Sequence, residues 1–204
     1  MGHNKKVLIM RVFIAVLILI FNLQSLTKAD DIRDFEIEGM SIGDSLLDHV
    51  NKSELKEFVF PYSKKTFKGV IFHNLSNDYD AIQFSVKAND SNLIIHNISA
   101  KIYFENKYNE CIDKMLEITE AFESVISDKT KTQSKDNIKR SKESDPSGKS
   151  IWSYRAFYFD DGSAAQVFCT DWSNELSKSQ NYIDELKAAL YSKEFTDFLY
   201  SLND

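Results

Sequence analysis

The chain contains few of the residues from which metal sites are built. Of its 204 residues, four are histidine and two are cysteine. Three of the histidines, His49, His73 and His96, lie beyond the N-terminal segment; they show no i, i+4 spacing and have no cysteine near them. Zinc motifs depend on such spacing. We therefore expect no metal site and no cofactor.

Basic residues are also scarce. The 25 Lys and Arg residues are outnumbered by 31 Asp and Glu, which gives a net charge of −6. Residues 1–29 hold four basic residues and no acidic one, so the net charge of the remainder falls to −10. An acidic chain without a basic cluster repels the phosphate backbone. Nucleic acid is therefore not an expected partner.

Long apolar runs are missing except for one at residues 12–21. This run is shorter than the roughly 17–25 residues of a membrane span. Basic residues precede it, and a small-residue cleavage site ending at Ala29 follows, as in a secretory signal peptide. The pattern predicts a signal peptide at residues 1–29 and a single exported domain at residues 30–204, periplasmic or extracellular and without a stable membrane span. An uncleaved N-terminal anchor is the alternative.

The rest of the chain shows two periodicities. Alternation of apolar and polar residues predicts strands, and apolar positions three and four apart predict helices. The expected strands are 68–75, 81–87, 94–104, 152–159 and 164–172, and the expected longer helices are 108–126 and 182–202. Residues 127–150 are almost wholly polar and are expected to form a mobile loop. The order predicts an α+β fold: a single antiparallel sheet of about five strands with helices packed mainly on one face.

Asp161-Gly162 between two strands is a strong hairpin signal. A two-residue turn there would pair Tyr158 with Ala165 and place Tyr154, Ala156 and Tyr158 on an inner face. The opposite face would then carry Arg155, Phe157 and Phe168. An exposed patch of these three residues is a candidate binding surface for a ligand or partner. The alternative is that the final helix or the polar loop covers them.

The two cysteines, Cys111 and Cys169, both lie in the part expected to be exported, where an even count favours a disulfide. Cys169 falls on the inner face of the hairpin beside Val167. Cys111 falls in the first turn of the helix at 108–126, next to its apolar stripe. A helix packed on that sheet face would bring the two sulfurs together. Two separate buried thiols, or a lone reactive Cys111, are the alternatives.

Two short motifs resemble catalytic signatures. Gly43-Asp44-Ser45-Leu46 has the letters of a serine esterase motif, but no histidine follows His96, and Asp-x-x-His is absent. A serine without a base is not activated, so either Asp44 or Ser45 is expected to cap a helix. The letters SGKS at residues 147–150 resemble a phosphate loop, but Glu143 stands where that motif requires glycine.

Several strings resemble an uncharacterised family of small exported proteins of marine bacteria. They are IEGMSIGDSL (37–46), DAIQF (80–84), EC (110–111), SGKS (147–150), CTDW (169–172) and SKEF (192–195). The resemblance implies a Gram-negative periplasm and cysteines in the same two places. It implies no activity and no ligand.

Taken together, these patterns predict an exported soluble protein without catalytic machinery. We expect a binding or envelope-accessory module whose partner is an unknown protein or a small-molecule ligand. The alternative is a hydrolase with an unrecognised active site.

Overall fold

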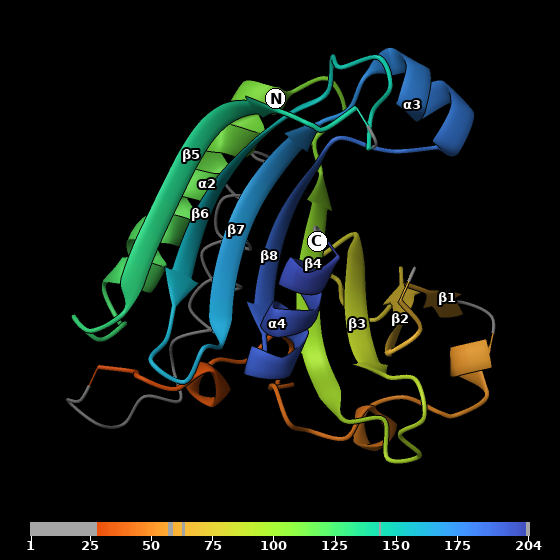
Figure 1. Ribbon diagram of the computed structural model, residues 1–204, viewed down its shortest axis with the longest axis vertical. Coiled ribbons are helices and arrows are strands. Elements are labelled where there is room, and N and C mark those ends of the chain that lie inside the picture. The colour runs from red at the N-terminus through yellow and green to blue at the C-terminus, as the bar shows by residue number, and fades with distance from the viewer. Residues whose placement is uncertain (1–27, 57–58, 63, 143, 203–204) are drawn as a thin grey trace.

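The computed structural model describes residues 28–56, 59–62, 64–142 and 144–202, and shows an α+β fold on one antiparallel sheet (Figure 1). The strand order is β1-β2-β3-β4-β8-β7-β6-β5. Seven strands have six residues or more: β2 (Phe67–Phe72), β3 (Ala81–Lys87), β4 (Ile95–Tyr103), β5 (Lys131–Lys139), β6 (Ile151–Tyr158), β7 (Ala164–Asp171) and β8 (Glu185–Tyr191). A three-residue strand, β1 (Val59–Pro61), forms one edge.

The helices are α2 (Tyr108–Glu123), α3 (Asn174–Gln180) and α4 (Lys193–Ser201), with short 3-10 turns η1 (Ile32–Asp34), η2 (Leu46–Asp48) and η3 (Glu54–Lys56). The predicted class and the single antiparallel sheet are confirmed, but the expected number of about five strands is wrong. Two segments account for the difference. The expected mobile loop at 127–150 contains β5, and the expected helix at 182–202 is β8 followed by α4.

The helices α2 and α4 pack on opposite faces of the sheet, which corrects the expectation that helices lie mainly on one face (Figure 1). Cys111 of α2 packs in a cluster with Leu186 of β8. Phe195 of α4 packs in a different cluster with Ala189 of β8. Leu186 and Ala189 are an odd number of positions apart along β8. Because successive side chains in a strand point to opposite faces, these two lie on opposite faces of the sheet.

The main core lies on the α2 face of the sheet. Beside α2, the segment at residues 29–55 covers β2, β3 and β4 and buries its apolar side chains against them. Phe35 of this segment is 1 % exposed and stacks on Phe122, with ring centroids 4.5 Å apart. Burying each such ring contributes about 1.5–3 kcal/mol. Residues 29–55 are therefore part of the folded core.

The segment begins at residues that the predicted cleavage would remove. Ala29 is 2 % exposed; its N–H donates to Val125 at 2.9 Å, and its carbonyl accepts from the Ser127 N–H at 2.8 Å. Most of the predicted signal peptide, residues 1–27, lies outside the described residues. Within the described part of the chain, no helix is both long and apolar enough to cross a membrane.

The predicted disulfide between Cys111 and Cys169 is confirmed. It joins the first turn of α2 to β7 with 5.9 Å between the Cα atoms, across a sequence separation of 58. Both cysteines are at most 1 % exposed. A disulfide is typical of oxidising compartments, and this one is consistent with export.

The hairpin forms where Asp161-Gly162 predicts it, but the predicted register is wrong by one residue. Tyr158 pairs with Ala164, not with Ala165. The loop closes through a Gly162 N–H bond to the Phe159 carbonyl, with Gly162 at φ +89°. This is a type I turn followed by a left-handed residue, which adds one residue to the loop. A shift of one residue exchanges the faces, so Tyr154, Ala156 and Tyr158 lie on the α4 face.

Candidate functional site

The three residues of the predicted surface patch do not come together. Phe157 is 1 % exposed and packs against Phe122 of α2, with ring centroids 4.8 Å apart. Arg155 lies on the same face and forms an ion pair with Asp136 at 2.8 Å. Phe168 is on the opposite face, where the Lys187 ammonium lies 5.7 Å from its ring centroid. The error in register accounts for this separation.

Ser45 caps η2, as predicted. Its hydroxyl accepts from the Leu47 N–H at 3.3 Å and donates to the Asn92 carbonyl at 2.8 Å. Both bonds are to backbone groups, which is the arrangement of a helix cap and not of an activated nucleophile.

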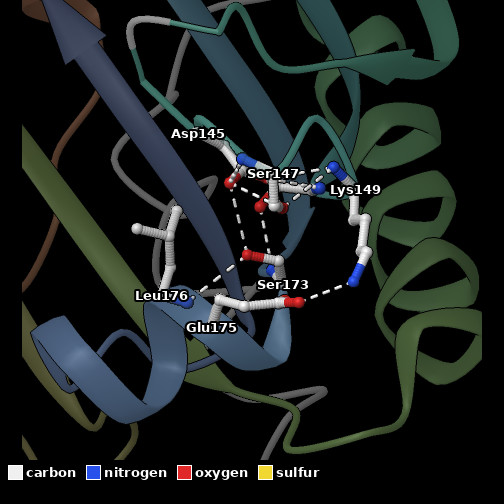
Figure 2. A network of polar contacts seen from close by, with 7 residues as sticks. Asp145, Ser147, Lys149, Ser173, Glu175 and Leu176 are labelled. Atoms are coloured by element: carbon white, nitrogen blue, oxygen red, sulfur yellow. Dashed lines mark hydrogen bonds and ion pairs between the residues drawn. The ribbon is translucent and has the colours of Figure 1, made fainter.

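The SGKS loop does bind an anion with its backbone, but the anion is the carboxylate of Asp145 (Figure 2). The N–H groups of Ser147, Lys149 and Ser150 donate to it at 3.0, 3.1 and 2.8 Å. Asp145 is 1 % exposed. Burial by itself would raise the pKa of Asp145, but the hydrogen bonds from Ser150 and Ser147 outweigh it, and the pKa is lowered. The amides that a phosphate would need are already occupied.

A histidine, a serine and a carboxylate meet at the start of α4. The Nδ1 atom of His96 lies 3.0 Å from the Ser192 hydroxyl and 3.4 Å from the Glu194 carboxylate. In a catalytic triad the serine and the acid contact different ring nitrogens, whereas here both contact the same one. The Ser192 hydroxyl also accepts from the Phe195 N–H at 3.2 Å as the cap of α4. The cluster therefore has the geometry of a capped helix start.

Across the described ranges, no group of three or more His, Cys, Asp or Glu side chains is arranged to hold a metal ion. Burial lowers the pKa of His96, and the nearby Glu194 carboxylate opposes that effect.

A hollow of about 370 Å³ lies on the α4 face, between α4 and strands β5, β6 and β7. We call it the aromatic pocket. Its floor is Ala156 of β6, whose side chain is small. Along β6, Tyr154 and Tyr158 stand on either side of Ala156, about 13 Å apart at a rise of about 3.3 Å per residue. Small and large side chains alternating on one face thus create the hollow.

The other two sides of the aromatic pocket carry amides. Gln133 of β5 and Gln166 of β7 are the cross-strand partners of Ala156 on its two sides. Two strand spacings separate their Cα atoms by about 10 Å. Residues of α4, among them Thr196 and Tyr200, close the pocket from above the sheet. The pocket is therefore bounded by aromatic rings in one direction and by amides in the other.

The tyrosine wall is held by a stack of planar groups. The Arg140 guanidinium lies 5.1 Å from the ring centroid of Trp172 and 4.5 Å from that of Trp152. Trp152 in turn stacks on Tyr154, with centroids 4.8 Å apart and planes at 27°. Arg140 also donates to the Thr170 hydroxyl at 2.9 Å. Trp152 covers one face of Tyr154, and Tyr154 as a whole is 7 % exposed.

The polar groups of the pocket are only partly satisfied. The Tyr200 hydroxyl donates to Tyr158 at 3.4 Å, and Tyr158 donates to the Gln133 side chain at 3.3 Å. Thr196 is 8 % exposed, and its hydroxyl oxygen is buried without a hydrogen-bond partner among the described residues. Buried polar side chains are rarely left unpaired. The oxygen itself is buried, so this hydroxyl belongs to the packing of α4 on the sheet.

The lining of the pocket is uncharged. Among the described residues that line it there is no Asp, Glu, Lys, Arg or His. Burial raises the pKa of Tyr154, Tyr158 and Tyr191, so these hydroxyls stay protonated. Lys187 lies on the same face of the sheet, opposite Phe168; burial lowers the pKa of Lys187 to about 8, with repulsion from Lys101 adding to the effect.

Sequence reasoning missed this pocket, although one signal for it was present. The order Trp152-x-Tyr154-x-Ala156-x-Tyr158 places three aromatic rings and one small residue on one face of a strand. That pattern predicts a gap between rings, provided that the face is not filled by another element. Comparison with known proteins adds no assignment, because no protein-family model, curated protein or solved structure matches the chain.

Proposed function

We propose that this protein is an exported, non-catalytic binding protein that holds a small uncharged molecule in the aromatic pocket. The observation that carries the proposal is the lining of the aromatic pocket, which combines aromatic side chains with the amides of Gln133 and Gln166 and holds no charged residue among the described ones.

The volume of the pocket also supports the proposal that it binds a small molecule. A volume of about 370 Å³ falls within the range of roughly 300–1,000 Å³ that is usual for small-molecule sites. Such sites combine aromatic walls with a few placed polar groups. Here the walls include Tyr154 and Tyr158, and the placed polar groups are the amides of Gln133 and Gln166. A charged ligand would find no opposite charge in the lining, so an uncharged one is favoured.

The hydrolase alternative has its best arrangement at His96, Ser192 and Glu194. Its geometry supports capping, because the serine and the acid share one ring nitrogen. The capping bond from Ser192 to α4 would also have to break before the serine could react.

The proposal is tested by ligand-observed NMR with small probes of similar shape. Benzamide, phenol and cyclohexanol represent uncharged molecules, and benzoate and benzylammonium represent the two charges. We expect the uncharged probes to bind and the charged ones to bind more weakly. Gln166→Trp, which fills the pocket from β7, should abolish binding.

Thr132→Trp is the matched control, because Thr132 is exposed and pairs with Phe157 on the other face of the sheet. Binding should survive this change. Binding of the uncharged probes that persists in Gln166→Trp, or no binding in the unchanged protein, contradicts the proposal.

A further inference from the structure

The charge of the chain is concentrated unevenly along the sequence. Residues 127–142 hold six basic residues and two acidic ones, although acidic residues are in excess in the whole chain. This corrects the expectation of a chain without a basic cluster. One of the six, Arg140, packs against tryptophan rings. The other five are exposed and lie in or beside β5, which forms a free edge of the sheet (Figure 1). We call them the lysine edge: Lys129, Lys131, Lys135, Lys139 and Lys142.

The acidic residues of this segment do not neutralise the lysine edge. The Asp128 carboxylate pairs with Lys28 at 2.5 Å, and the Asp136 carboxylate pairs with Arg155 at 2.8 Å. Among the residues that the structure describes, none of the five lysines forms an ion pair. The lysine edge therefore presents uncompensated positive charge on a protein that is acidic elsewhere.

The lysine edge is longer than the strand that it borders. Lysines on an edge strand disfavour pairing of that strand with other chains. This role concerns β5 alone, which spans about 30 Å at a rise of about 3.3 Å per residue. Lys129 precedes β5 and Lys142 follows it, so both lie where no strand edge is left to protect. The extended row of positive charge therefore needs a further explanation.

The chemistry of the lysine edge suits a flat anionic surface. Protein partners are usually held by apolar or aromatic side chains that become buried in the interface. β5 exposes none, since its only apolar residue, Ile138, is partly buried. A flat anionic surface requires only exposed cations. Because lysine side chains are long and flexible, those on either face of an edge strand can reach the same surface.

The chain enters the fold next to the lysine edge. Ala29 bonds through its N–H to Val125 and through its carbonyl to Ser127, and Lys28 pairs with Asp128, the neighbour of Lys129. In the sequence, six residues separate Lys28 from the apolar run at 12–21. An apolar run of this kind directs a chain to the membrane for export. The lysine edge is thus the part of the domain that follows the predicted membrane-directing segment most closely in space.

We propose that the lysine edge docks this protein onto the anionic headgroups of a membrane surface, without a membrane span. Each lysine close to an anionic membrane strengthens binding about five-fold. The acidic remainder of the protein is repelled by the same surface, so the domain is held by this edge in one orientation. The contact is between exposed charges and weakens as salt is added. This proposal is independent of the aromatic pocket.

The test is co-sedimentation of the purified full-length chain with lipid vesicles. Vesicles of phosphatidylcholine alone are compared with vesicles of equal parts phosphatidylcholine and phosphatidylglycerol. We expect stronger binding to the anionic vesicles, decreasing as sodium chloride is added. The triple variant Lys131→Gln/Lys135→Gln/Lys139→Gln should bind them roughly ten- to a hundred-fold more weakly, because it removes three of the five lysines.

The control is Lys52→Gln/Lys65→Gln/Lys178→Gln, which removes the same charge from exposed lysines outside residues 127–142. It should bind nearly as well as the unchanged protein, and circular dichroism checks that both variants are folded. The N-terminal segment is identical in all three proteins, so differences between them report on the lysines.

Three outcomes would overturn the proposal. The first is equal binding to neutral and anionic vesicles, or to neither. The second is an equal loss of binding in the two triple variants, which would make net charge responsible and not the lysine edge. The third concerns poly-glutamate, which is included as an acidic polypeptide. If the lysine edge binds poly-glutamate and not the vesicles, its partner is an acidic protein.

Discussion

Replacing Thr196 with valine removes one hydroxyl from α4 and keeps the shape of the side chain. The two residues are both β-branched and have similar helix propensities. The hydroxyl of Thr196 has no partner among the described residues, so its burial costs about 1–3 kcal/mol that valine avoids. We expect Thr196→Val to stabilise the ligand-free protein by about 1 kcal/mol. For a chain of this size that corresponds to a rise in Tm of about 2–4 °C.

Thr119 provides a matched comparison within the same protein. It is also a buried helical threonine, 6 % exposed against 8 % for Thr196. Its hydroxyl, however, donates to the Met115 carbonyl at 2.7 Å. Thr119→Val loses that bond and should destabilise the protein by about 0.5–1.5 kcal/mol. The same chemical change is therefore expected to have opposite signs at the two sites.

Urea denaturation followed by circular dichroism measures both effects, provided that the m-value stays constant. The reasoning is refuted if Thr196→Val destabilises the protein as much as Thr119→Val does. That result would mean that the Thr196 hydroxyl has a partner in solution.

Asp145→Asn should lower the Tm more than Ser45→Ala does, because it weakens the bonds to three backbone N–H groups. Because the pKa of Asp145 is lowered in the folded protein, its carboxylate stabilises the fold above the unfolded pKa of about 3.9, and this stability is lost as the pH falls. The free energy of unfolding should therefore decrease less steeply with falling pH in Asp145→Asn than in the unchanged protein. An equal decrease in both proteins would contradict this. Replacing Cys111 and Cys169 with alanine should cost about 4 kcal/mol in a urea titration, and an unchanged midpoint would argue against the disulfide. Ser45→Ala should cost about 0.5–2 kcal/mol by the same assay, and any esterase activity should survive it; loss of such activity in a folded variant would make Ser45 a nucleophile.

The strands and the helix in the middle of the chain were predictable because apolar and polar residues recur along them at regular spacing. Residues 81–87 match β3, and the helix predicted from 108 begins at the same residue as α2. β3 is buried on both faces, but its second face holds the polar residues Gln83 and Ser85, so the alternation remains visible in the sequence. The disulfide followed from these elements, since Cys169 and Val167 do face α2.

Three strands escaped prediction: the three-residue edge strand β1, and the longer strands β5 and β8, which lack such alternation. β5 is an edge strand with polar residues on both sides, so no apolar alternation marks it. Its charged residues disfavour pairing of this exposed edge with a strand of another chain. β8 lies in the middle of the sheet with residues buried on both faces, and Leu186 and Leu190 fall at helical spacing by coincidence. Tertiary position overrides local propensity in both cases.

Prediction of the pocket from the sequence depended on the length of one turn. Asp161-Gly162 suits a two-residue turn and also the longer loop that Gly162 closes here. The choice between them decides whether Tyr154 and Tyr158 face α2 or α4. The nearby SKEF string at 192–195 contained a second signal, because Ser192 is a good helix cap. Reading it as a helix start would have separated β8 from α4.

The position of β8 sets the order in which the sheet can be completed. Ile98 of β4 and Ala165 of β7 both pair with Leu190 of β8. During synthesis, β1 to β4 and β5 to β7 emerge as two half-sheets, and neither can join the other until β8 is made. Until then the inner edges of β4 and β7 keep backbone N–H and C=O groups without a partner strand, and such edges can pair with strands of other chains. Pairing across so long a stretch of chain also folds slowly, so this protein is most exposed to aggregation just before its last strand emerges.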